Sequence, residues 1–157
     1  MNIIERKKWL YMLIASAIFI SSVFIAVESF NKLAFAEEIV VYKSPTCGCC
    51  NKCVKHLEDN GFSVKTKDYR DMQPVKKMFG VKQKFQSCHT AKIGNYFIEG
   101  HVSASDIKRL LKEKPDIKGL SVPDMPMGSP GMEGHRKDNY DVLVIDKDNK
   151  VSIYSKH

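Results

Sequence analysis

An apolar run leads directly into a cluster of cysteines in the segment Ile39-Val40-Val41-Tyr42-Lys43-Ser44-Pro45-Thr46-Cys47-Gly48-Cys49-Cys50-Asn51-Lys52-Cys53. Four of the five cysteines of the chain lie in the last seven residues of this segment. Thiolates are the ligands that soft metals prefer. A redox dithiol needs only two sulfurs, and a disulfide restricts the unfolded chain most when its partners are far apart in sequence. The crowding therefore favours a polynuclear Cu(I) site with bridging sulfurs. A thioredoxin-like Cys-x-x-Cys pair, Cys47/Cys50 or Cys50/Cys53, is the alternative.

Residues 1–36 have the pattern of a secretory signal peptide. Three basic residues at 6–8 precede an uncharged apolar run at 10–27, and Ala34-Phe35-Ala36 predicts cleavage before Glu37. The apolar run of about 18 residues is near the lower limit for a membrane-spanning helix, so an uncleaved anchor stays open as the only membrane contact. In both cases we expect residues 37–157 to form one exported, periplasmic domain.

The charge of the chain is spread over many lysines. Residues 1–36 carry four Lys/Arg and two Asp/Glu, so cleavage lowers the net charge from +7 to about +5. Because the lysines are scattered and not gathered in one stripe, we expect a solvated surface and no nucleic-acid partner. Five cysteines are an odd number, so in an oxidising compartment at least one stays free, binds a metal or pairs with another chain.

Strand and helix patterns alternate along residues 37–157. Their order, β-α-β-α-β-β-α, predicts an α/β domain of the thioredoxin or glutaredoxin type, in which the active site lies between the first strand and the first helix. A Met/Pro/Gly loop at 122–132 and an added hairpin at 140–145 and 151–154 complete the chain. The predicted elements are strands at 39–42, 62–67, 90–93 and 96–99, and helices at 49–60, 72–79 and 103–114.

Five motifs follow one another along residues 39–155: Tyr42–Cys50, Ser87–Ala91, Glu99–Val102, Met125–Glu133 and Tyr140–Leu143. Together they resemble the CopG-like periplasmic copper-resistance proteins, a family of small exported domains long catalogued as a domain of unknown function. The resemblance implies a thioredoxin-like fold that holds a cysteine-bridged copper cluster on Cys47, Cys49, Cys50 and Cys88. Cys53 stands where the family has an aromatic residue, usually tryptophan. Its role as an extra ligand, a resolving thiol or a core residue stays open.

Histidines and methionines add further candidate ligands. His101 is the preferred ligand other than the cysteines, and a turn-capping role for its side chain is the alternative. His89 adjoins Cys88, but neighbours on a strand point to opposite faces, so we do not expect both in the site. The loop methionines lack a periodic core face, and thioethers suit Cu(I). The predicted metal ligands are Cys47, Cys49, Cys50, Cys88, His101 and Met132, and the weaker candidates are Cys53, Met127, Met125, His89 and His135.

The sequence is compatible with three classes of function. Copper binding, by storage, transfer or redox change at a cluster, is preferred, with copper ions and other exported copper-handling proteins as partners. A thiol–disulfide oxidoreductase using Cys47 and Cys50 is the main alternative, although no tryptophan precedes Cys47 and no Thr-Pro precedes the third strand. A structural role with two disulfides is disfavoured by the adjacent Cys49 and Cys50. Zinc is a further metal to consider, but a Cys₄ zinc site normally comes as two separated Cys-x-x-Cys pairs, and the cysteine cluster is too compact for that. The topology predicts that Cys88 Sγ lies about 2–4 Å from a motif sulfur.

Overall fold

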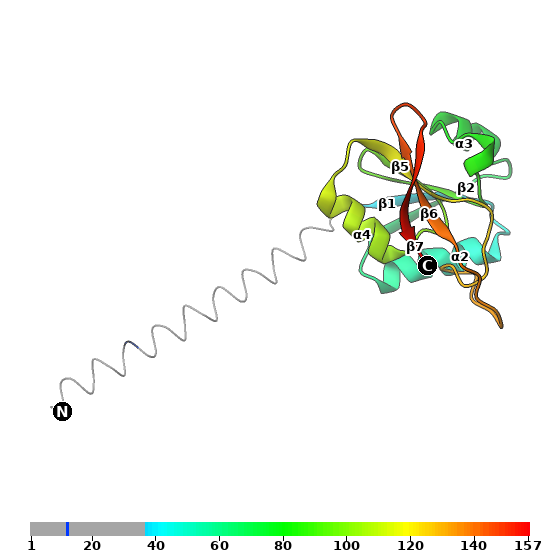
Figure 1. The fold of residues 1–157 in the computed structure, drawn as a ribbon. Helices are drawn as coiled ribbons and strands as arrows, with labels where there is room; N and C mark the ends of the chain where they lie inside the picture. Colours follow the sequence, from blue (N-terminus) through cyan, green and yellow to red (C-terminus); the bar gives the residue numbers. More distant parts are fainter. Residues whose placement is uncertain (1–11, 13–36) are drawn as a thin grey trace. The chain divides into compact units, whose positions relative to one another are not determined.

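The computed structural model describes Met12 and residues 37–157, and residues 37–157 form a mixed α/β unit (Figure 1). Within these residues, three α-helices accompany a seven-stranded sheet with the strand order β2-β1-β3-β4-β5-β6-β7. The predicted signal peptide lies outside the described residues, apart from Met12. In the described part of the chain, no helix has the length and apolar character needed to cross a membrane. The elements are β1 (Ile39–Lys43), α2 (Gly48–Asp59), β2 (Val64–Asp68), α3 (Gln73–Met78), β3 (Thr90–Ile93), β4 (Tyr96–Gly100), α4 (Ala104–Glu113), β5 (Ile117–Val122), β6 (Asp141–Asp146) and β7 (Val151–Lys156).

The predicted helices and strands are found within two residues of their expected ends because local signals define them. Ser103 caps α4 through its Oγ, which accepts a hydrogen bond from the Asp106 backbone N–H at 3.1 Å. Gly61, with φ of 88°, follows α2 and allows the chain to turn back toward β2. Proline lies in the first turn of α3, where its missing N–H costs nothing.

Strand β5 was not predicted, and the sheet is therefore longer than the sequence suggested. Its sequence contains Lys118 and Gly119, which interrupt the apolar pattern. The glycine is needed by packing, since a Cβ at this position would lie 2.0 Å from the carbonyl oxygen of Phe97 on β4. Strand β5 pairs in parallel with β4, to which α4 connects it, and antiparallel with β6. The C-terminal hairpin thus continues the central sheet.

The pairing register of β1, β3 and β4 places three of the segments that connect the strands at the same edge of the sheet. Tyr42 of β1 pairs with Thr90 of β3, and Thr90 pairs with Glu99 of β4. The end of β1, the start of β3 and the end of β4 therefore lie side by side. The residues that follow or precede this row are the cysteine segment after β1, Cys88 and His89 before β3, and His101 after β4.

The helices cover both faces of the central strands, which are buried on both sides. Helices α2 and α4 lie on one side and α3 on the other (Figure 1). His56 of α2 accepts a hydrogen bond at Nε2 from the backbone N–H of Ala104, which starts α4. On the α3 side, Tyr42 packs against Phe79, with ring centroids 5.3 Å apart. These layers hold the first turn of α2 against the sheet edge.

Candidate metal centre

The first turn of α2 carries three of the cysteines. Cys47 is the N-cap, and its Sγ accepts a hydrogen bond from the backbone N–H of Cys50 at 3.3 Å. Cys47 and Cys50 are joined by a disulfide, while Cys49 is a free thiol. Helix N-termini present unpaired N–H groups and a positive dipole end, which favour negative charge on sulfur. The helix start thus presents sulfurs in a setting suited to both metal binding and redox exchange.

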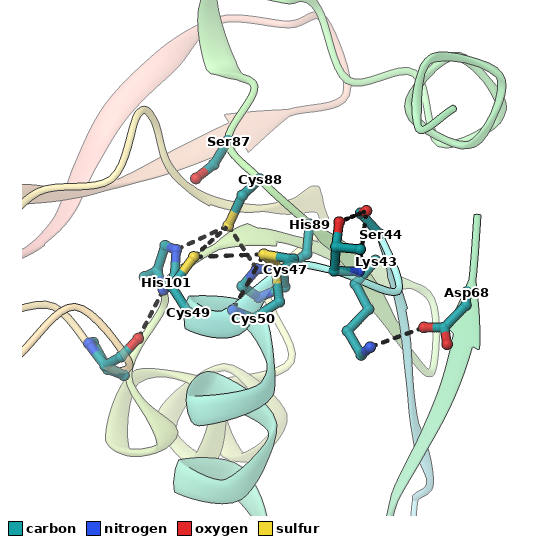
Figure 2. The surroundings of a disulfide bond; sticks show 12 residues. Lys43, Ser44, Cys47, Cys49, Cys50, Asp68, Ser87, Cys88, His89 and His101 are labelled. Atoms are coloured by element: carbon teal, nitrogen blue, oxygen red, sulfur yellow. Dashed lines mark hydrogen bonds and ion pairs between the residues drawn. A yellow bond between two sulfur atoms is a disulfide. The ribbon is translucent and has the colours of Figure 1, made fainter. Parts of the chain in front are cut away.

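Cys88 approaches these cysteines from the segment that precedes β3. Its Sγ lies 3.9 Å from Cys49 Sγ, which in turn lies 3.5 Å from Cys47 Sγ (Figure 2). The Sγ atoms of Cys47, Cys49, Cys50 and Cys88, here called the four-sulfur group, all lie within 4.8 Å of one another. The predicted approach of Cys88 to a motif sulfur is confirmed, although the disulfide joins Cys47 to Cys50 and leaves Cys88 free.

Two buried histidines extend the site on the far side of Cys88. His101 Nε2 lies 2.9 Å from Cys88 Sγ, and His89 Nδ1 lies 3.2 Å from the same sulfur. Their ring centroids are 5.0 Å apart. We call Cys88, His89 and His101 the Cys/His group; its donor atoms lie within 4.8 Å of one another.

The expectation that His89 and Cys88 point to opposite faces is wrong. Strand β3 begins only at Thr90, so the alternation of a strand does not apply to the two residues that precede it. His101 is fully buried, and its Nδ1 lies 2.7 Å from the carbonyl oxygen of Pro130. A carbonyl can only accept, so Nδ1 carries the proton and Nε2 turns its lone pair toward Cys88.

Burial keeps the Cys/His group uncharged in the metal-free protein. Burial, and to a smaller extent the neighbouring Cys49, raises the pKa of Cys88 to about 12. Burial lowers the pKa of His89 to about 3, with smaller effects from His101 and Lys76, and also lowers the pKa of His101. The imidazoles are therefore neutral, as ligands must be, while a metal has to displace the thiol proton of Cys88.

The Met/Pro/Gly loop contributes two of its three methionines to this region. Met127 and Met132 line a hollow of about 350 Å³ together with Cys49. Met125 lines a different hollow, beside Tyr140, and 47 % of its surface is exposed. His135 is exposed. Of the predicted loop ligands, the structure thus brings Met127 and Met132 beside a cysteine and leaves Met125 and His135 in other surroundings.

The loop is held against α2 by close backbone contact. Gly131 has φ of 86°, and a Cβ there would lie 2.6 Å from the Cys49 carbonyl oxygen and 2.8 Å from the Cys53 nitrogen.

Cys53 is 1 % exposed, free and outside both donor groups. Burial raises the pKa of Cys53 to about 12. These features favour the core-residue interpretation of Cys53.

Sequence reasoning missed a buried ion pair beside the site. Lys76 Nζ on α3 lies 2.5 Å from Glu99 Oε1 and 3.2 Å from Thr90 Oγ1. Thr90 donates to Glu99 Oε2 at 2.6 Å, and the Ser87 backbone N–H donates to Glu99 Oε1 at 2.7 Å. We call Lys76, Thr90 and Glu99 the ion-pair cluster. A lysine next to a second lysine on a short helix resembles a solvated face, so no local signal marks Lys76 as buried.

Comparisons with known proteins agree with this geometry. The family model described as "Protein of unknown function, DUF411" matches residues 85–132. A solved structure named "Copper resistance protein copG- Form 2" is 43% identical, with a TM-score of 0.73, and the match covers 77% of this chain and 98% of that chain. A second, "Copper resistance protein copG- Form 1", is 44% identical, with a TM-score of 0.72, and the match covers 76% and 96% of the two chains. A search of curated proteins found no match. With this identity over nearly the whole length of the solved chains, the protein belongs to the CopG family of copper resistance proteins.

Proposed function

We propose that the protein is an exported copper-binding protein that holds Cu(I) in a cysteine-bridged, polynuclear cluster and serves copper resistance. One observation carries the proposal: four Sγ atoms from two separate segments lie within 4.8 Å of one another. Soft thiolates at this spacing suit Cu(I) better than a hard cation. The names of the two similar solved structures support the same metal.

The chemistry requires the reduced form of the four-sulfur group. A dithiol donor supplies two electrons and two protons to the Cys47–Cys50 bond, which becomes two thiols, while the donor becomes a disulfide. Copper then displaces the thiol protons. Shared sulfurs allow several low-coordinate Cu(I) ions on four cysteines, and His101 Nε2 and the thioether of Met132 are the further ligands we propose.

The finer fold and the location of the protein belong to the same proposal. The order β2-β1-β3-β4, with β1 and β2 parallel and β3 antiparallel to both β1 and β4, supports a thioredoxin-like core to which β5, β6 and β7 are added. Residues 1–36 serve as a signal peptide, and other exported copper-handling proteins are the partners. Mass spectrometry of the exported product tests this: we expect a chain that begins at Glu37, and a mass that retains residues 1–36 would indicate an anchored protein.

Anaerobic titration of the reduced protein with Cu(I) tests the copper proposal directly. We expect more than one copper per chain and the loss of reactive thiols in step with copper bound. The protein with its Cys47–Cys50 disulfide intact is the matched control, and it should bind less Cu(I) because two of the four sulfurs are blocked. Equal copper binding by both forms would contradict a four-sulfur cluster.

The disulfide between Cys47 and Cys50 favours a second candidate, a thiol–disulfide oxidoreductase of exported proteins. Cys49 Sγ lies 3.5 Å from Cys47 Sγ, so a third thiol stands within reach of the bond. Insulin reduction separates the two functions. Thioredoxin-like rates together with weak copper binding would replace the copper proposal with this one.

A further inference from the structure

The Cys/His group is a second set of metal donors that does not need the blocked cysteines. Its donor atoms are the Sγ of Cys88, the Nδ1 of His89 and the Nε2 of His101. The Nδ1 of His89 lies 3.2 Å from the Cys88 sulfur, and the Nε2 of His101 lies 2.9 Å from it. Neither Cys47 nor Cys50 belongs to it, so the disulfide leaves all three donors available. The free thiol of Cys49 lies 3.9 Å from Cys88 Sγ but does not belong to this group.

The orientation of His101 is already that of a metal ligand. Histidines that bind metals usually donate their other ring N–H to a carbonyl or carboxylate, which holds the ring and its tautomer. In this protein the Pro130 carbonyl receives the Nδ1–H of His101, and Nε2 faces the sulfur of Cys88. Pro130 belongs to the loop whose Gly131 packs on α2, so the loop holds this ring in place.

We propose that, while Cys47 and Cys50 form a disulfide, Cys88, His89 and His101 bind one divalent transition-metal ion of the Zn²⁺ type, with water as the fourth ligand. Three protein ligands of the thiolate and imidazole type plus one water are a donor set that Zn²⁺ takes in four-coordinate sites. Metal binding releases the thiol proton of Cys88. Reduction of the disulfide, with two electrons and two protons from a dithiol donor, restores the four-sulfur group.

The two proposed metal centres exclude one another because Cys88 and His101 belong to both. The oxidised form therefore takes a single divalent ion, and the reduced form takes Cu(I). This inference relies on the proposed copper cluster only for the reduced form. The oxidised site depends on the Cys/His group alone and is tested without copper.

Co²⁺ is a suitable probe because it replaces Zn²⁺ and reports its ligands by absorption. The protein, without a polyhistidine tag and with its disulfide intact, is titrated with Co²⁺ under anaerobic conditions. We expect one Co²⁺ per chain, tetrahedral ligand-field bands, a thiolate-to-cobalt charge-transfer band, and displacement by one equivalent of Zn²⁺. An oxidised protein that binds no Co²⁺, or binds it without a thiolate band, would overturn the proposal.

Variants identify the ligands. Cys88→Ser, a nearly isosteric change, should remove the charge-transfer band and weaken Co²⁺ binding by more than about tenfold, because changing a group that only orients a metal ligand already costs about 10–100-fold in affinity. His89→Gln and His101→Gln should weaken it similarly, with circular dichroism confirming that each variant is folded. His135→Ala, at an exposed loop position, should bind like the unaltered protein. A Cys88→Ser variant that keeps full affinity and the thiolate band would overturn the assignment.

The failure of this inference and the failure of the proposed function can be told apart. Co²⁺ binding by the oxidised protein, with no Cu(I) cluster in the reduced protein, supports this inference and removes the copper proposal. A Cu(I) cluster in the reduced protein, with no Co²⁺ bound by the oxidised protein, does the opposite.

Discussion

The four-sulfur group and the ion-pair cluster lie on either side of the start of β3, and they are built differently. In the ion-pair cluster, the carboxylate of Glu99 receives hydrogen bonds from Lys76, Thr90 and the Ser87 backbone, so the buried charges are matched. In the four-sulfur group, thiols and a disulfide face one another and neutral imidazoles. Buried groups that satisfy one another hold a structure in place, whereas soft donors that converge leave positions for a metal.

The two clusters are also connected. Glu99 accepts the backbone N–H of Ser87, the residue directly before Cys88, and the Gly100 N–H donates to the carbonyl of His89 at 2.9 Å. The segment that carries Cys88 and His89 is thus held on both sides. The ion-pair cluster serves as a support, and the four-sulfur group as the site that it positions.

The largest expected effect is the loss of bound copper from variants of the four-sulfur group. Serine at Cys47, Cys49, Cys50 or Cys88 should each collapse the copper-to-protein ratio of the reduced protein, because in the proposed cluster each bridging sulfur contacts more than one ion. The ratio is measured by anaerobic Cu(I) titration with elemental analysis. A serine variant that retains all of its copper would show that the altered cysteine is not a bridging ligand.

The next effect concerns stability. Glu99→Gln leaves the Lys76 ammonium buried without its counter-charge and should lower the free energy of unfolding by about 3–5 kcal/mol. The double variant Lys76→Met/Glu99→Gln removes both charges and should recover most of this loss. Urea unfolding of the oxidised, metal-free protein measures both. A loss below about 1 kcal/mol in the single variant would show that the pair is not a support.

A smaller effect is the pH dependence of stability that His89 of the Cys/His group contributes. Because burial lowers the pKa of His89 to about 3, the folded protein keeps this imidazole neutral while the unfolded chain protonates it near pH 6.5. This contribution to stability is present above pH 6.5 and is lost as the pH falls toward 3, by about 1.4 kcal/mol per pH unit.

His89→Gln should therefore flatten the acid side of the stability profile of the metal-free protein. Urea unfolding between pH 7 and pH 4 measures the slope, with His135→Ala as the exposed control. If the slope of His89→Gln matches that of the control, His89 is not the group responsible.

The smallest effect is expected at Cys53, which lies in the cysteine segment but outside the four-sulfur group. Cys53→Ala should cost about 1 kcal/mol of stability, as is typical of a small core truncation, and should leave the copper ratio unchanged. Titration and urea unfolding of the same sample measure both. A reduced copper ratio would make Cys53 a ligand.

The sequence alone determined the elements and the chemistry of the first turn of α2. Capping residues, glycines after helices and apolar periodicity are local signals, so the helices and six of the seven strands of the sheet were predicted. The order of these elements was enough to bring Cys88 to Cys49 across 39 positions of sequence. Crowded cysteines indicated soft-metal chemistry before any contact was known.

Only the tertiary structure decided which partners these residues have. Strand β5 depends on the close approach of Gly119 to Phe97, and the burial of Lys76 depends on Glu99, a residue 23 positions away. The direction of His89 depends on where β3 begins, and the separation of Met125 from Met127 depends on how the loop packs on α2. Each of these features follows from long-range register and packing, because a side chain's neighbours across a sheet are not specified by the residues beside it in the chain.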